Sequence, residues 1–208
     1  MRFENREDAA RQLLPLLKKI IDAPPLVLAI PRGGVPLGRV IADGVGADLD
    51  VVLVRKIGAP CNPEFAVGSV GESGAVFIAD HARQSGAEAA YISSEAGRQL
   101  ALIQRRRARY SALRPAIDIS GRTIIAVDDG LATGATARSA IQEIRRQSPG
   151  KIICAVPVAS DEAAAAIAPL VDMFVCLHVS QNFRGVGQFY RDFAQVDDAT
   201  VEGLLAAH

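Results

Sequence analysis

The sequence predicts an α/β fold in which a mainly parallel sheet lies between helices. Short apolar runs rich in β-branched residues alternate along the chain with stretches of helical spacing, as strands joined by crossover helices require. Such continuous apolar runs are typical of strands buried on both faces. At 208 residues, of which 50% are hydrophobic, the chain has the size and the core of one domain.

The first elements follow in order from the N-terminus. Residues 5–21 place leucine, alanine and isoleucine at helical spacing and predict an amphipathic helix that ends before Pro24-Pro25. Residues 26–30 predict a strand, which Pro31-Arg32-Gly33-Gly34 breaks before a helix over 35–42. The remaining strands are predicted at 51–54, 123–127, 152–158 and 173–177. The remaining helices between them are predicted at 136–147 and 161–168.

Two stretches interrupt this alternation. Residues 58–79 hold Gly68, Gly71 and Gly74 around short β-like pieces, which fits either a hairpin or a mobile loop. Residues 86–109 have high helix propensity and predict a long exposed helix that carries Arg105-Arg106-Arg107.

Charge and hydropathy exclude several classes of partner. The 23 basic residues balance the 23 acidic ones, which argues against nucleic acid and against an anionic membrane as partners. The N-terminus has no apolar signal region, and no apolar run approaches the roughly 20 residues that span a bilayer. We therefore expect a cytoplasmic protein without membrane contact.

Three other kinds of site lack their signatures. His81, His178 and His208 form no close pairs of the kind that hold zinc. The tetrad Gly71-Glu72-Ser73-Gly74 lacks the Gly-x-Ser-x-Gly spacing of a serine hydrolase. Gly185-Val186-Gly187 lacks the third glycine and the strand-to-helix context of a dinucleotide site.

The segment 124–136 carries the strongest chemical signal, because a buried strand leads through two acids and a small-residue loop into a helix. At the carboxyl end of a parallel strand, Asp128 and Asp129 would face the crevice where open α/β sheets bind ligands, and could accept hydrogen bonds from vicinal sugar hydroxyls. The following residues would bring backbone N–H groups and hydroxyls to a helix N-terminus, which suits a phosphate monoester. The alternative is an ordinary cap, in which the acids and Thr133 and Thr136 satisfy the first helical turn. Capping requires neither two acids nor the Thr-Gly-Ala-Thr that follows.

This segment resembles the 5-phosphoribosyl-1-pyrophosphate (PRPP) motif of the type I phosphoribosyltransferases. The resemblance implies that Asp128 and Asp129 hold the ribose hydroxyls and that the following loop wraps the 5-phosphate. The residues it assigns to PRPP from this segment are Asp128, Asp129, Gly130, Leu131, Ala132, Thr133, Gly134, Ala135 and Thr136.

Two further elements fit the same family. Guanidinium groups bind phosphate oxygens bidentately and glycines allow close approach, so Arg32, Gly33 and Gly34 suit a pyrophosphate, although an ordinary strand-to-helix turn is the alternative. The basic pair Arg55-Lys56 stands where family members often have a residue that reaches the pyrophosphate; the alternative is solvated charges at a strand end.

The family fold that the resemblance implies is a five-stranded parallel sheet between helices, with a small hood. The chain would then be one domain, 1–208, with its core at about 26–177 and a helical insertion at about 86–110. The hood would come from about 178–208 together with the N-terminal segment, and Phe183, Phe189 and Tyr190 could stack on a flat acceptor there. Phe189 and Tyr190 could equally be core anchors.

The resemblance also implies a reaction. Mg²⁺ would bridge pyrophosphate oxygens and ribose hydroxyls beside Asp128 and Asp129, directly or indirectly, and Arg32 and Lys56 would stabilise the leaving pyrophosphate. A nitrogenous base would receive the phosphoribosyl group, and segment 58–74 would close as a lid. Glu64 and Glu72 in that lid are further candidates for proton transfer. Members that use 6-oxopurines commonly have an acid where this chain has Ala132, which argues against hypoxanthine or guanine.

The main alternative is a protein that keeps the PRPP site to sense the metabolite and to regulate a partner. Arg105-Arg106-Arg107 with Arg109 supports it, but successive helical positions point in different directions, so a solvated helix explains the run more simply. The family resemblance alone suggests a homodimer.

Overall fold

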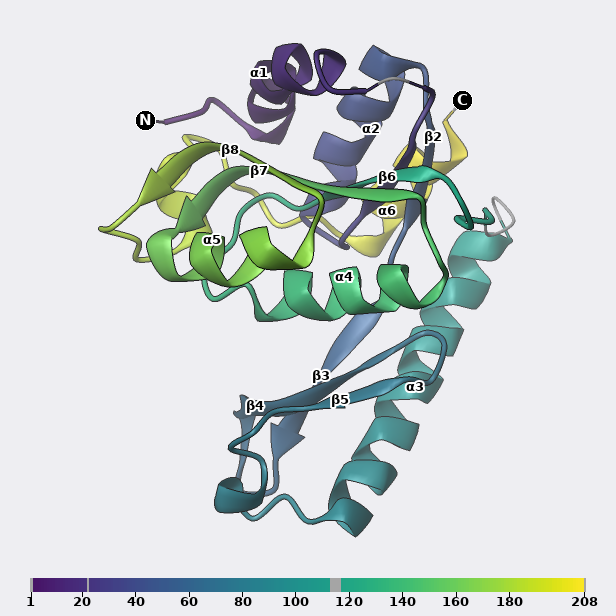
Figure 1. The fold of residues 1–208 in the computed structure, drawn as a ribbon, viewed down its shortest axis with the longest axis vertical. Helices are drawn as coiled ribbons and strands as arrows, with labels where there is room; N and C mark the ends of the chain where they lie inside the picture. The colour runs from purple at the N-terminus through teal and green to yellow at the C-terminus, as the bar shows by residue number, and fades with distance from the viewer. Residues whose placement is uncertain (1, 22, 113–116, 208) are drawn as a thin grey trace.

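The computed structural model describes residues 2–21, 23–112 and 117–207 and confirms the predicted fold class. Five parallel strands form the main sheet in the order β2-β1-β6-β7-β8 (Figure 1). Their bounds are Leu26–Ala29 for β1, Asp48–Val51 for β2, Thr123–Val127 for β6, Lys151–Ser160 for β7 and Met173–Ser180 for β8.

Helices cover both faces of this sheet because the central strands β1, β6 and β7 are apolar on both sides. Alternate residues of β1, β6 and β7, such as Val27, Ile125 and Ile153, pack with α1 (Arg6–Lys18) and α2 (Gly34–Val45) on one face. The residues between them pack with α4 (Ala135–Arg146) and α5 (Asp161–Ile167) on the other face.

The order of the strands creates one crevice. The chain passes from β1 through α2 to β2 on one side, and from β6 through α4 to β7 on the other. Because β1 and β6 are neighbours with Ala29 opposite Val127, the loops that follow them start side by side. This is the topological switch point, where open α/β sheets bind their ligands.

The prediction of one strand at 51–54 is wrong. The chain there breaks between two strands, because β2 ends at Val51 and β3 begins at Val54. The chain leaves the main sheet between them and forms an antiparallel sheet of β3 (Val54–Ala59), β4 (Asn62–Gly71) and β5 (Val76–Ile78). We call this sheet the arm, which projects away from the main sheet in Figure 1. Of the two alternatives for residues 58–79, the structure shows the hairpin.

The long helix α3 (Ala89–Ser111) follows a short 3₁₀ turn at Arg83–Ser85 and runs beside the arm. It is mostly exposed, as predicted, except for an apolar stripe that includes Ile92 and Ile103. The arginine run is not uniformly solvated, however. Arg107 is half-buried, pairs with both oxygens of Glu72 at 2.8 and 2.9 Å, and donates to Asp50 at 2.9 Å.

The C-terminal segment returns to the N-terminus after a 3₁₀ turn at Ala168–Leu170 and strand β8. The Phe3 amide donates to the Phe189 carbonyl at 2.7 Å, and the Arg191 amide donates to the Phe3 carbonyl at 2.8 Å. A 3₁₀ turn (Val186–Phe189) and α6 (Asp198–Ala206) complete the chain, and α6 contacts α2 and α3. Within the described residues, no helix combines the length and the hydropathy that crossing a bilayer would require.

Candidate functional site

Strand β6 delivers two acids to the crevice. All but the first of its five residues are buried, and the chain leaves the sheet at Val127. The Asp129 amide donates to Asp128 Oδ1 at 2.8 Å, which fixes the half-buried Asp128 carboxyl and leaves its other oxygen for a ligand. Both acids therefore lie at the carboxyl end of a central strand, as the sequence predicts.

Asp129 is already engaged by the protein. Both Nε and Nη2 of Arg6, at the start of α1, lie 2.9 Å from Asp129 Oδ2, and both side chains are largely buried. Arg6 Nη1 donates to the Ala194 carbonyl at 2.8 Å, and its guanidinium stacks 4.0 Å from the centre of the Phe193 ring. The Tyr190 hydroxyl donates to the Asp129 carbonyl at 2.6 Å. Sequence analysis missed the role of Arg6, because 123 residues separate it from Asp129.

The two acids therefore differ in electrostatics. Burial, and next the neighbouring charge of Asp129, raise the pKa of Asp128 well above its ordinary value. Burial also raises the pKa of Asp129, but the charge and hydrogen bonds of Arg6 oppose that rise. Arg6 thus favours the ionised form of Asp129.

The loop after the acids lies between β7 and α4. The Leu131 amide donates to Val158 and its carbonyl accepts from Ser160, both at 2.9 Å, so the loop continues the sheet for one residue. The Ser160 hydroxyl donates to the Ala132 carbonyl at 2.6 Å, a role that sequence analysis missed. Gly134 has φ 72°, a left-handed conformation that favours glycine, and α4 begins directly after it.

A pocket of about 170 Å³ opens over this loop. Asp128, Thr133 and Thr136 line it together with Val186 from the C-terminal segment. The twelve-residue helix α4 directs its N-terminus toward this loop, which gives the pocket the N–H groups and the dipole that attract an anion.

The loop after β1 packs directly on the acids and contains a cis peptide bond between Pro31 and Arg32. A Cβ at Gly33 would lie 2.0 Å from Asp129 Oδ2, and one at Gly34 would lie 2.4 Å from the Val127 carbonyl oxygen. The two glycines therefore allow this loop to pack closely against the end of β6 and the acids that follow it. The Arg32 guanidinium points to Asp198 of α6, with Nη1 3.9 Å from Oδ1.

The basic pair Arg55-Lys56 also reaches the loop 130–136. Both side chains line a pocket of about 310 Å³ together with Thr133 and Thr136. Arg55 Nε donates to Gln99 of α3 at 2.5 Å, so α3, which we call the arm helix because it runs beside the arm, orients Arg55. Lys56 is exposed.

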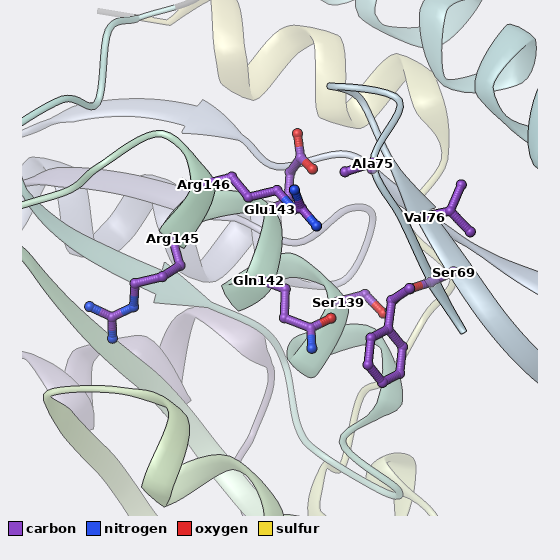
Figure 2. A pocket seen from close by; sticks show the side chains of 10 residues that line it. Ser69, Ala75, Val76, Ser139, Gln142, Glu143, Arg145 and Arg146 are labelled. Carbon is purple, nitrogen blue, oxygen red and sulfur yellow. The ribbon is translucent and has the colours of Figure 1, made fainter. Parts of the chain in front are cut away.

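A neighbouring pocket of about 320 Å³ lies between the arm and α4 and is lined by residues of both (Figure 2). Figure 2 shows Gln142 and Arg146 of α4 directed at it, while Arg145 points away toward its partners Leu170 and Asp172. Glu143 is 3% exposed and accepts hydrogen bonds from the amide and the hydroxyl of Ser73, both at 2.8 Å. Glu143 thus joins the arm to α4.

The structure corrects several candidate residues. Phe189 and Tyr190 are 5% and 1% exposed, so they are core side chains without a free ring face for a heterocycle. Phe183 is half-buried and packs on Phe189 with ring centres 5.1 Å apart. Glu72 is held by Arg107 and is not placed for proton transfer, and burial, more than this pairing, shifts its pKa upward. The side chain of Glu64 lies outside the described residues.

Residues 3–194 match the family model described as a phosphoribosyl transferase domain. The chain belongs to this family. Two Mycobacterium tuberculosis proteins, from strains CDC 1551 and H37Rv, carry provisional phosphoribosyl transferase names and are 41% identical to it over 208 residues. The match covers 99% of this chain but 47% of each relative, so the chain spans about half of their length.

Solved structures agree with the fold. A Thermus thermophilus protein is 41% identical with a TM-score of 0.88, and the match covers 99% of this chain and 98% of that one. A purine phosphoribosyltransferase from Pyrococcus horikoshii shares the fold at 15% identity and a TM-score of 0.50, over 92% and 93% of the two chains.

Proposed function

We propose that this chain binds PRPP with Mg²⁺ and transfers its phosphoribosyl group to a nitrogenous base, releasing pyrophosphate. One observation carries the proposal: Asp128, the loop 130–136 and the Arg32-Gly33-Gly34 loop meet at the switch point of the sheet. Family membership agrees with this placement but leaves the activity open.

Each part of PRPP has a complementary surface. The loop 130–136 and the N-terminus of α4 suit the 5-phosphate, because N–H groups and the hydroxyls of Thr133 and Thr136 converge on the pocket there. The free oxygen of Asp128 can accept from the ribose hydroxyls. Arg32 and Lys56 bring positive charge from the loop after β1 and from the arm toward the pyrophosphate.

The residues fit a magnesium ion that arrives with its substrate. Among the described residues no three histidine, cysteine, aspartate or glutamate side chains gather into a metal site. Mg²⁺ often uses one or two carboxylates and substrate phosphates and keeps several waters. Asp128 would hold it, and Asp129 would contribute indirectly because Arg6 occupies its Oδ2. When bound, the ion would neutralise charge on the departing pyrophosphate.

In the reaction, the acceptor nitrogen forms a bond to the anomeric carbon while the bond from that carbon to the pyrophosphate oxygen breaks. The base loses its proton to solvent or to a general base. Charge grows on the leaving group, so the cations around it and exclusion of water supply the catalysis, without a covalent nucleophile. Ala132 provides no carboxyl beside the loop, so we propose an acceptor other than a 6-oxopurine.

Calorimetric titration with PRPP and Mg²⁺, followed by product detection with a panel of purine and pyrimidine bases, tests the proposal. We expect saturable, Mg²⁺-dependent binding and one base that gives a nucleoside monophosphate and pyrophosphate. Binding without product from any base would favour the PRPP-sensing alternative. Absence of binding at millimolar PRPP would overturn both.

A further inference from the structure

Three arginines from two different segments converge on one carboxylate beside the proposed pyrophosphate site. Asp198 Oδ1 lies 3.9 Å from Arg32 Nη1 and 3.6 Å from Arg106 Nη2, and Asp198 Oδ2 lies 3.6 Å from Arg109 Nη1. Arg32 belongs to the loop after β1, whereas Arg106 and Arg109 belong to the last turns of α3. The same carboxylate therefore neutralises cations of the loop and of the arm helix.

This cluster is incompletely satisfied. Asp198 Oδ1 is shielded from solvent but, among the described residues, accepts no hydrogen bond, since both neighbouring guanidinium groups stay beyond hydrogen-bonding distance. Tyr110 is 2% exposed, and its buried hydroxyl likewise has no partner within the described part of the chain. Burial, more than the nearby charges of Arg106, Asp198 and Arg109, raises the pKa of this hydroxyl. Buried polar groups without partners mark a place where a ligand or water belongs.

The cluster also remains open enough to exchange its anion. The side chains of Arg32 and Arg106 are each 33% exposed, and that of Asp198 is 27% exposed. If Arg32 turned away to a phosphate, Asp198 would keep Arg109 as a partner, and Arg109 also pairs with Glu202 at 2.6 Å. Release of Arg32 would therefore leave no unpaired carboxylate.

We propose that Asp198 is an internal stand-in for a pyrophosphate oxygen, and that Arg106 of α3 binds pyrophosphate together with Arg32 once the substrate displaces this carboxylate. Both guanidinium groups lie within 4 Å of one oxygen position, so both attract an anionic oxygen placed there and need to shift only slightly to donate to it. Arg106 then joins the arm helix to the leaving group. The inference rests on the proposed function, because it extends the site that Arg32 begins.

Two substitutions test this inference, one that removes a positive charge of the cluster and one that removes its negative charge. We expect Arg106→Gln to weaken binding of Mg²⁺-pyrophosphate and of Mg²⁺-PRPP about fivefold or more, as loss of a charge-assisted contact would. Arg106→Lys should recover part of that loss. Asp198→Asn removes the competing charge and should tighten binding of both ligands several-fold.

The matched control is Arg105→Gln, which removes an equal charge from the adjacent, exposed position and should leave both affinities unchanged. Calorimetry gives the affinities, and thermal unfolding of each variant shows that it is folded.

The outcomes separate this inference from the proposed function. If the unmodified protein binds neither ligand, the proposed function fails. If it binds both, but Arg106→Gln behaves like Arg105→Gln, or Asp198→Asn weakens binding as much as Arg106→Gln does, the cluster only anchors α6 and the inference is overturned.

Discussion

At the scale of single residues, Gly33 and Asp129 determine each other's position. The carboxyl of Asp129 occupies the volume that any side chain at Gly33 would need, and Arg6 and Tyr190 hold the Asp129 residue from the other side. Asp128, in contrast, keeps an oxygen for a ligand. The two adjacent acids therefore differ: Asp129 braces the loops, and Asp128 is the acid that we propose contacts the substrate.

Gly33→Ala should lower both stability and PRPP affinity. Its Cβ would lie 2.0 Å from Asp129 Oδ2, so either the carboxyl or the loop must shift. We expect a loss of about 1–3 kcal/mol in the free energy of unfolding, the usual cost of overpacking. Urea denaturation measures the loss. Gly97→Ala is the control, because a Cβ there meets nothing within 4 Å in the middle of α3, and alanine should stabilise that helix slightly.

PRPP affinity should rise with pH because of Asp128. Its raised pKa means that the folded, ligand-free protein keeps this proton above the ordinary pKa of an aspartate, while an unfolded chain has already lost it. Stability therefore falls as pH rises from the pKa of Asp128 in the unfolded chain to its raised pKa in the folded protein. The ionised carboxylate, which we propose accepts from the ribose hydroxyls, predominates only above the raised pKa. Titration calorimetry at several pH values would show this.

The comparison for that experiment is Asp128→Asn, because the phosphate groups of PRPP also change their protonation with pH. The variant should bind PRPP weakly and retain only the pH dependence that comes from the ligand. An identical pH dependence in both proteins would mean that Asp128 does not contact the substrate.

At the scale of elements, the arm brings side chains to the loop 130–136 from outside the main sheet. β3 brings Arg55 and Lys56 to the same pocket as Thr133 and Thr136. The β3–β4 pairing shifts register on either side of Gly58, an irregularity that bends such hairpins.

We therefore expect residues 58–74 to close over bound PRPP. Hydrogen exchange of backbone amides in this segment should slow several-fold when Mg²⁺-PRPP is added, because closure shields them from water. The Asp128→Asn variant at the same ligand concentration provides the unliganded reference. Equal exchange rates with and without saturating PRPP in the unmodified protein would remove the lid role.

At the scale of the whole molecule, both ends of the chain support the site at its centre. Helix α1 provides Arg6, and the C-terminal segment provides the Tyr190 hydroxyl, the Phe193 ring and the Ala194 carbonyl. The segment predicted as a hood thus lies beside the acids. Whether it also contacts the acceptor stays a prediction.

Removal of Arg6 should destabilise the whole fold. Arg6→Met leaves the buried Asp129 carboxylate without its cation, which costs about 3–5 kcal/mol when a buried pair loses one partner. In the Asp129→Asn background the same substitution should cost much less, because no charge is left unpaired. Urea denaturation of the two single variants and the double variant measures this coupling, and additive losses would contradict it.

Arg191→Met serves as the control for that cycle. Arg191 pairs with Glu4 in the same region, but both side chains are more than 60% exposed. Its loss should change the free energy of unfolding by about 0.5 kcal/mol or less.

The sequence by itself determined the α/β class, most strands of the main sheet and the Asp128–Thr136 segment, because these depend on local signals: apolar runs, glycine turns and a short motif in continuous chain. It did not determine the break between β2 and β3, where one apolar run serves two sheets. It left open whether residues 58–79 form a hairpin.

Only the tertiary structure decided which charges meet. Three ion pairs join residues that are far apart in the sequence: Arg6 and Asp129 are 123 positions apart, Arg107 and Glu72 are 35 apart, and Arg106 and Asp198 are 92 apart. No local pattern encodes such contacts, because each depends on how distant elements pack. The same packing buried Phe189 and Tyr190, which the sequence alone left as candidates for either the core or the acceptor site.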